Sequence, residues 1–133
     1  MTRRCFTYGL WMDADFMQTQ CPGAIRIGPV ALEEYQFFIM KDGYASIRPC
    51  AGSVVWGVLW EVTKKHEETI DEEEEVPTLY VKCKLSDLYA FYYLATSLEE
   101  GVAKDGYVES IIQSALNARF PLAYIWELSA WLP

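Results

Sequence analysis

The segment 54–62 constrains the fold of this chain more than any other. It reads Val-Val-Trp-Gly-Val-Leu-Trp-Glu-Val and is apolar on both faces for most of its length. A strand of this kind has to be covered on both sides, so we expect it in the middle of a sheet. Gly57 inside it indicates a bulge, a bend or a close approach of another backbone. The chain is therefore predicted to fold around a buried sheet.

Shorter patterns on both sides of this segment supply the other elements. Apolar alternation and aromatic runs predict further strands at 3–8, 24–31, 34–40, 44–47, 79–85 and 88–96. Apolar spacing and candidate caps predict helices at 11–20, 64–73, 107–118 and 122–131. Turns are expected at 21–23, 41–43 and 51–53. Consecutive strands joined by short turns pair antiparallel, so the fold class is α+β, and a sheet this aromatic can curl into a small closed or half-closed β-barrel.

The size and charge of the chain exclude several classes of protein. Its 133 residues are 52% hydrophobic, which suits a single domain over 1–133 with a sizeable core. The net charge of -8, with scattered Lys and Arg, argues against a nucleic-acid partner and against an anionic membrane surface. The four cysteines are far apart without a CxxC pair, and we expect no metal or cofactor. Without a long apolar run, the protein is expected in the cytoplasm with reduced thiols.

The stretch 70–80 carries five consecutive carboxylates, at positions 71–75. With Glu67 and Glu68, seven of the nine residues from 67 to 75 are acidic. One interpretation is a solvated acidic loop, because charge runs usually face water. The other is a functional acid or base whose pKa is raised by its neighbours. His66, the single histidine, is interpreted as a solvated surface residue rather than a catalytic base.

A second candidate feature is the Tyr8-Gly9 turn between the first predicted strand and the first predicted helix. Backbone N–H groups at the start of a helix, and in the loop before it, are suited to hold a carboxylate. The alternative is a plain tight turn. The sequence around Gly9 alone leaves both interpretations open.

Several segments match one family pattern in order and with similar spacing. They are Tyr8-Gly9, Met12…Met17…Cys21-Pro22-Gly23-Ala24, Gly43-Tyr44-Ala45-Ser46-Ile47, Val55-Trp56-Gly57-Val58-Leu59-Trp60, Ile70-Asp71-x-x-Glu74, Tyr93-Leu94, Tyr107 and Pro121-Leu122-x-Tyr124. On these motifs the chain resembles the γ-glutamylcyclotransferase-like family, which includes the AIG2-like proteins. The match extends over nearly the whole chain.

This resemblance implies a mixed, mainly antiparallel β-barrel flanked by helices. It also implies an activity, the cleavage of a γ-glutamyl amide by its own α-amine, which releases 5-oxoproline and a free amine or amino acid. The implied general acid/base is Glu74. The implied substrate-binding residues are the head-group loop and three pocket tyrosines: Tyr8, Gly9, Leu10, Trp11, Tyr80, Tyr93 and Tyr107.

The chemistry of such a reaction suits the side chains that this sequence offers. The attacking amine and the carbonyl belong to one molecule, so the protein has to hold the chain curled and needs no nucleophile of its own. One carboxylate with a pKa near neutrality can take the proton from the amine and pass it to the leaving group. A chain without a Ser/His, Cys/His or metal set is compatible with this mechanism.

Four positions depart from the family pattern. Glu67 occupies an apolar position of the helix before the Asp71-x-x-Glu74 motif. Leu10 and Trp11 stand where the pattern has a Ser or Thr hydroxyl and its neighbour, so only backbone donors are left to hold a carboxylate. Glu75 stands where Gly usually follows the catalytic glutamate, which is costly if the site needs a positive φ. A register in which Glu73 or Glu75 points inward therefore stays open. The alternative function is a catalytically silent binding protein, and the apolar helix 122–131 either covers a barrel end or forms a homodimer contact.

Overall fold

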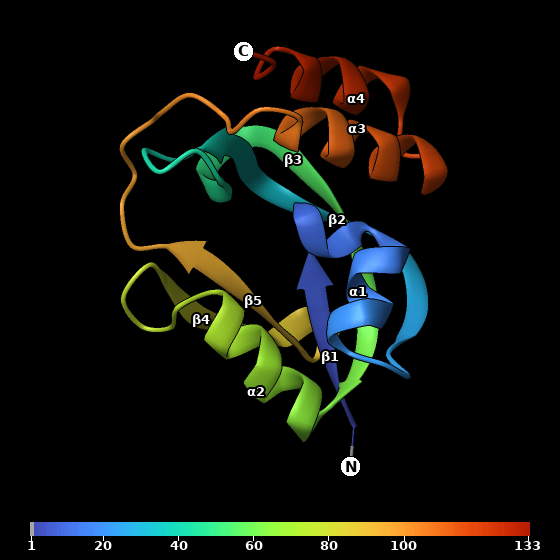
Figure 1. Ribbon diagram of the computed structural model, residues 1–133. Helices are drawn as coiled ribbons and strands as arrows, with labels where there is room; N and C mark the ends of the chain where they lie inside the picture. The colour runs from blue at the N-terminus through green and yellow to red at the C-terminus, as the bar shows by residue number, and fades with distance from the viewer. Residues whose placement is uncertain (1) are drawn as a thin grey trace.

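The computed structural model describes residues 2–133 and contains one five-stranded sheet (Figure 1). Its strands are β1 (Thr2–Thr7), β2 (Ile25–Ile39), β3 (Ala45–Thr63), β4 (Tyr80–Leu85) and β5 (Ala90–Ala95). They lie in the order β2-β3-β1-β5-β4, with β1 and β5 parallel and every other pair antiparallel. The mixed, mainly antiparallel α+β class is confirmed. The sheet curves strongly without closing, because β2 and β4 form its two edges.

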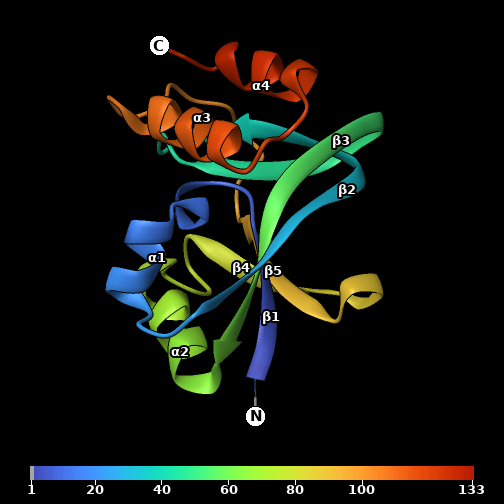
Figure 2. The ribbon, with the colours of Figure 1, turned by 90° about the vertical axis from the view of Figure 1, so that its right-hand side faces the viewer.

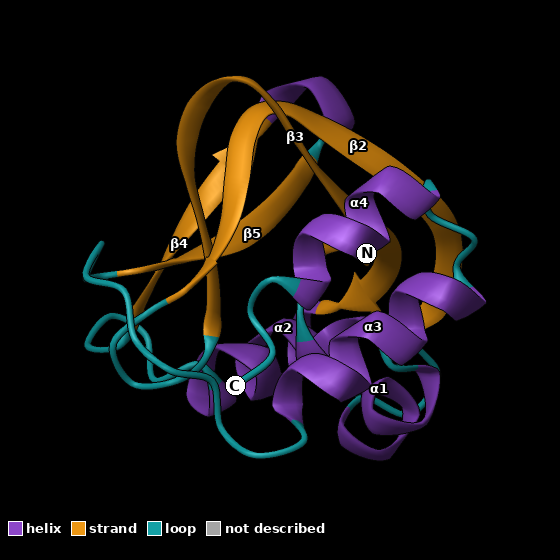
Figure 3. Cartoon of the chain, turned by 90° about the horizontal axis from the view of Figure 1, so that it is seen from above, coloured by secondary structure: helices purple, strands orange, loops and turns teal. Residues whose placement is uncertain are grey.

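Helices flank the sheet, as predicted. They are α1 (Ala14–Gln20), α2 (Lys64–Glu73), α3 (Tyr107–Asn117) and α4 (Leu122–Ser129), with short 3-10 turns η1 (Leu10–Met12) and η2 (Ser86–Leu88). Figure 2 shows α3 and α4 stacked at one end of the molecule, and α1 and α2 at the end nearer the N-terminus. Seen from above, α1, α2 and α3 lie on one side of the curved strands (Figure 3). No helix in residues 2–133 has the length and hydropathy to cross a membrane.

The strand 54–62 is buried, as predicted, but β1 and not β3 occupies the middle of the sheet. The prediction missed that β1 pairs on both sides, antiparallel with β3 and parallel with β5. Gly57 marks a close backbone approach, one of the three predicted reasons for it. A Cβ there would lie 2.3 Å from the Thr7 carbonyl oxygen and 2.7 Å from the Phe6 ring.

The hairpin of β2 and β3 is longer and more regular than predicted. The expected strands 24–31 and 34–40 are one strand, and the turn expected at 51–53 is wrong because β3 runs through it. Pairing continues from Ile25 opposite Glu61 to Ile39 opposite Ala45, with register shifts that absorb the irregular residues. Glu34, at the second shift, has a φ of 68°. Breaker residues inside this hairpin therefore mark bulges and not chain reversals.

The N-terminal caps of α1 and α2 explain where these two helices begin. The predicted helix 11–20 is divided into η1 and α1, because Asp13 caps α1 by accepting a hydrogen bond of 2.8 Å from the Phe16 N–H. Thr63 caps α2, as predicted. His66 completes that cap: its Nδ1 accepts from the Thr63 N–H at 3.1 Å, and its Nε2 lies 2.8 Å from the Pro22 carbonyl oxygen. His66 is therefore a half-buried structural residue at the surface.

Candidate active site

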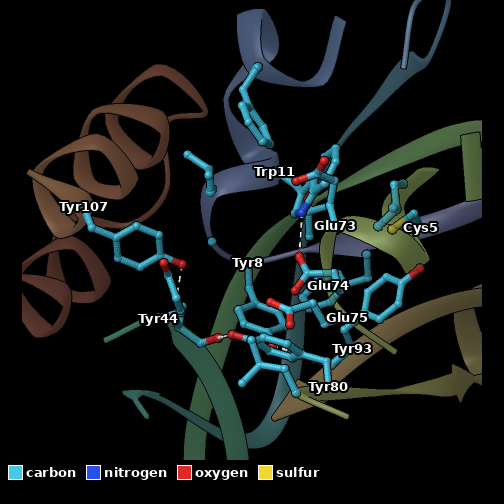
Figure 4. Close-up of a pocket in the computed structure, with 18 residues that line it drawn as sticks. Cys5, Tyr8, Trp11, Tyr44, Glu73, Glu74, Glu75, Tyr80, Tyr93 and Tyr107 are labelled. Atoms are coloured by element: carbon cyan, nitrogen blue, oxygen red, sulfur yellow. Dashed lines mark hydrogen bonds between the residues drawn. The ribbon is translucent and has the colours of Figure 1, made fainter. Parts of the chain in front are cut away.

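A cavity of about 400 Å³ opens between β1, η1, the C-terminal end of α2, β4, β5 and α3 (Figure 4). All eight residues predicted for the site line it: Tyr8, Gly9, Leu10, Trp11, Glu74, Tyr80, Tyr93 and Tyr107. They come from four parts of the sequence, at 8–11, 74–80, 93 and 107. No Lys, Arg or His is among the lining residues in the described part of the chain. The cavity is therefore aromatic and acidic.

The loop after β1 brings the backbone close to the opposite wall. The Met12 N–H donates to the Gly9 carbonyl oxygen at 3.1 Å, which closes η1 directly after the turn. A Cβ at Gly9 would lie 3.3 Å from the Ala45 Cβ and 3.4 Å from the Tyr107 hydroxyl oxygen. Glycine at this position thus lets the backbone of η1 form part of the cavity wall.

Glu74 enters the cavity because α2 ends there. Its N–H donates to the Ile70 carbonyl oxygen at 2.9 Å, as in the last turn of a helix. The next residue, Glu75, has a φ of 51°, the left-handed conformation that usually ends a helix at a glycine. Glu75 therefore does adopt the positive φ that was expected to be unfavourable for a glutamate. The change of chain direction at Glu75 keeps Glu74 on the cavity side.

Burial and one hydrogen bond determine how readily the Glu74 carboxylate takes up a proton. The Trp11 indole Nε1–H donates to Glu74 Oε1 at 2.6 Å. Burial raises the pKa of Glu74 from 4.5 to about 7; the Trp11 hydrogen bond opposes this, and the Glu73 charge adds to it. Neighbouring carboxylates were expected to be the main cause of a raised pKa, but removal from water is the larger one.

Most hydroxyl groups of the cavity tyrosines are already engaged in the protein. Tyr8 donates to the Tyr93 carbonyl oxygen at 2.5 Å, and Tyr80 donates to the Ala45 carbonyl oxygen at 2.6 Å. Tyr107 instead accepts, from the Ala45 N–H at 3.1 Å. Burial raises the pKa of Tyr107 above its ordinary value, so it keeps its proton. Within residues 2–133 that proton has no acceptor, which leaves it available to a ligand.

The sequence interpretation missed a charged network beside the cavity. Lys82 Nζ lies 2.8 Å from Asp71 Oδ2 and 2.5 Å from Glu67 Oε2. Glu67 is only 7% exposed, and Arg3 Nε lies 3.3 Å from its Oε1. Asp71 also accepts a hydrogen bond of 2.6 Å from the Tyr93 hydroxyl. The sequence did contain a signal for this network: positions 67, 71 and 74 are three to four residues apart, so they lie on one face of a helix.

Eight other lining residues were missed as members of the site: Cys5, Phe6, Thr7, Phe16, Tyr44, Ala45, Ile70 and Leu79. Most are apolar residues that sequence alone assigns to an ordinary core. Glu73 and Glu75, which the sequence left open as inward-pointing alternatives, also line the cavity. In the described residues, no group of three or more His, Cys, Asp or Glu side chains is arranged to hold a metal ion.

A family model described as "Gamma-glutamyl cyclotransferase, AIG2-like" matches residues 5–109. The chain belongs to this family. A human gamma-glutamylcyclotransferase is 29% identical over 99 residues, which cover 68% of this chain and 53% of the human protein. The chain thus matches about half the length of that curated relative.

Solved structures show the same fold. One titled "Gamma-glutamyl cyclotransferase" superposes with a TM-score of 0.87 at 23% identity, covering 100% of this chain and 89% of its own. An uncharacterised human protein gives a TM-score of 0.83 at 24% identity, with coverage of 99% and 89%. YkqA from Bacillus subtilis gives 0.81 at 18% identity, with coverage of 97% and 53%. The shared part therefore includes the whole cavity-forming sheet.

Proposed function

We propose that this protein is an enzyme of the γ-glutamylcyclotransferase type, which cleaves a γ-glutamyl amide and releases 5-oxoproline with a free amine or amino acid. Family membership supports a γ-glutamylcyclotransferase-like function. The observation that carries the specific proposal is Glu74. It places a carboxylate with a pKa of about 7 in the family's motif position, inside an aromatic cavity.

The proposed reaction needs only proton transfers from the protein. Glu74 accepts a proton from the substrate's α-ammonium group, and the resulting amine attacks the γ-carbonyl carbon. A new C–N bond closes the five-membered ring, and the bond between that carbon and the leaving nitrogen breaks. Glu74 returns its proton to the leaving nitrogen. The ring nitrogen then gives up its second proton, which passes to the released amine as this becomes an ammonium group, so protons, charge and electrons balance. A carboxylate with a pKa near neutrality suits both roles, and such catalysis contributes about 10²–10⁴-fold.

The remaining cavity residues suit the task of holding the substrate curled. The backbone of Gly9, Leu10 and Trp11 lines the cavity and offers N–H groups to the glutamyl carboxylate. Tyr107 offers its hydroxyl proton. Tyr8, Tyr80 and Tyr93 are tied to the protein and shape the walls. A volume of about 400 Å³ is sufficient for a small γ-glutamyl amide.

The test of this function is a panel of γ-glutamyl amides whose leaving groups are neutral, cationic or zwitterionic. Release of 5-oxoproline from at least one of them, measured by chromatography, is the expected result. Each reaction should release the amine in equal amount. Simple hydrolysis to free glutamate, or release from none of the panel, would contradict the proposal.

A catalytically silent binding protein is the second candidate, and one observation favours it. Trp11 occupies one oxygen of Glu74 even without a ligand, and Leu10 supplies no hydroxyl to the loop. For this function we expect calorimetry to detect binding of a γ-glutamyl amide while no member of the panel yields 5-oxoproline. Turnover of any of them would exclude it.

A further inference from the structure

The contact between Trp11 and Glu74 joins two parts of the site that the sequence interpretation kept separate. Trp11 belongs to η1 and is 8% exposed. Its ring packs edge-on against Phe16, with centroids 4.8 Å apart and an interplanar angle of 65°. Its indole N–H therefore reaches Glu74 Oε1 from a fixed position. Figure 4 shows this hydrogen bond running from the indole nitrogen to the carboxylate.

We propose that Trp11 is a positioning residue, which reserves Oε1 of Glu74 as an acceptor and so assigns proton exchange with the substrate to Oε2. This inference rests on the proposed function of Glu74. It gives the Trp11 side chain a role in addition to the contact with the substrate head group that the resemblance implies for this residue.

The asymmetry follows from the chemistry of the indole ring. An indole Nε1–H only donates hydrogen bonds, and has no lone pair with which to accept one. A proton on Oε1 would leave the indole N–H with the weaker acceptor of a hydroxyl oxygen in place of a carboxylate or carbonyl oxygen. The 2.6 Å contact therefore favours protonation of Glu74 on Oε2. Among residues 2–133, Trp11 is the one hydrogen-bond partner of the Glu74 side chain, which leaves Oε2 for the substrate.

The other charged and titratable groups around Glu74 do not donate a hydrogen bond to its carboxylate in residues 2–133. Those that line the cavity with it are Glu73, Glu75, Cys5, Tyr8, Tyr44, Tyr80, Tyr93 and Tyr107. Burial raises the pKa of Glu74, and the charge of Glu73 raises it further. The Trp11 hydrogen bond is the single influence named above that favours the ionised carboxylate. Removing this donor should therefore raise the pKa of Glu74.

Nuclear magnetic resonance of the ¹⁵N-labelled wild-type protein tests the pairing without any turnover. The Trp11 indole resonance should shift with pH with a midpoint of about 7. It should stay constant in Glu74→Gln, whose side chain does not titrate. An indole resonance that does not respond to pH in the wild-type protein would overturn the inference. Because no substrate is involved, this outcome is independent of whether a γ-glutamyl amide is cleaved.

Trp11→Phe tests the catalytic consequence, since it removes the donor and keeps an aromatic ring against Phe16. The acid limb of the pH profile of kcat/KM should move to higher pH, with a loss of about tenfold near pH 6 and little loss near pH 9, as expected for one hydrogen bond to a charged group. Trp126→Phe is the matched control, because Trp126 is 79% exposed on α4, and its profile should match the wild type. An unchanged profile, or an equal loss at every pH, would contradict the positioning role.

Discussion

The Tyr93 hydroxyl donates a hydrogen bond of 2.6 Å to Oδ1 of Asp71, three residues before Glu74. This contact fastens the C-terminal part of α2 to β5. Lys82 on β4 holds the other Asp71 oxygen at 2.8 Å. The end of α2, and with it the position of Glu74, therefore depends on two strands that follow it in the chain.

Loss of the Tyr93 hydroxyl should loosen this attachment. For Tyr93→Phe we expect the free energy of unfolding to fall by about 1 kcal/mol, the usual contribution of one hydrogen bond. Urea denaturation measures the change. Tyr89→Phe is the control, because Tyr89 is 86% exposed, and it should leave stability unchanged. Equal stability of both variants would show that the Asp71 contact contributes nothing.

Removal of Lys82 should cost more than removal of a neighbouring lysine. Lys82→Met leaves Glu67, which is only 7% exposed, with Arg3 as its remaining partner at 3.3 Å. Because the Lys82 side chain is 31% exposed, solvent screens part of the effect, and we expect a loss of about 1–2 kcal/mol. Lys84 lies two residues further along the same strand and forms no ion pair within residues 2–133, so Lys84→Met should change stability little. A similar loss in both variants, by urea denaturation, would contradict the importance of the Glu67 pairing.

Glu74 should make the protein less stable as pH rises. Its pKa is higher in the folded chain, about 7 against an ordinary 4.5, so the folded state binds the proton more tightly. The free energy of unfolding therefore falls between these two pH values and stays lower above them. Glu74→Gln removes this penalty, so we expect a gain of about 1–3 kcal/mol near pH 8 and little change near pH 4.

Urea denaturation of Glu74→Gln and of Glu73→Gln at both pH values distinguishes the effect of burying the Glu74 carboxylate from the effect of removing one negative charge. Glu73 is exposed, so its replacement should have a smaller effect at pH values on either side of neutrality. A gain for Glu74→Gln that is equal near pH 4 and near pH 8 would show that the pKa of Glu74 is not raised in the folded chain.

The sequence predicted the class of the fold, and the residues that line the cavity, better than it predicted their contacts. Motif order brought together Tyr8, Trp11 and Glu74, although the roles of these residues stay predictions. The partner of each side chain depends on pairing across the sheet, which local patterns do not specify. Thus the run at 71–75 did not show that Asp71 faces Lys82 and Tyr93 while Glu74 faces the cavity.

The errors in the strands have the same origin. Residues 51–53 have the composition of a turn, but β3 continues through them because β2 pairs with it on both sides of that point. The middle position of β1 was missed because its parallel partner, β5, is more than 80 residues away in the chain. Long-range pairing overrides local propensity in both cases.

The most direct test of the account is the rate of 5-oxoproline release from a γ-glutamyl amide by the wild-type protein, Glu74→Gln and Glu73→Gln. Both variants remove one carboxylate from the cavity lining, and only the first removes the half-buried one that accepts the Trp11 hydrogen bond. We predict that Glu74→Gln loses at least about 100-fold in rate, as expected for a general acid/base, while Glu73→Gln keeps most of its activity. Wild-type rates in folded Glu74→Gln would contradict the central role of this glutamate.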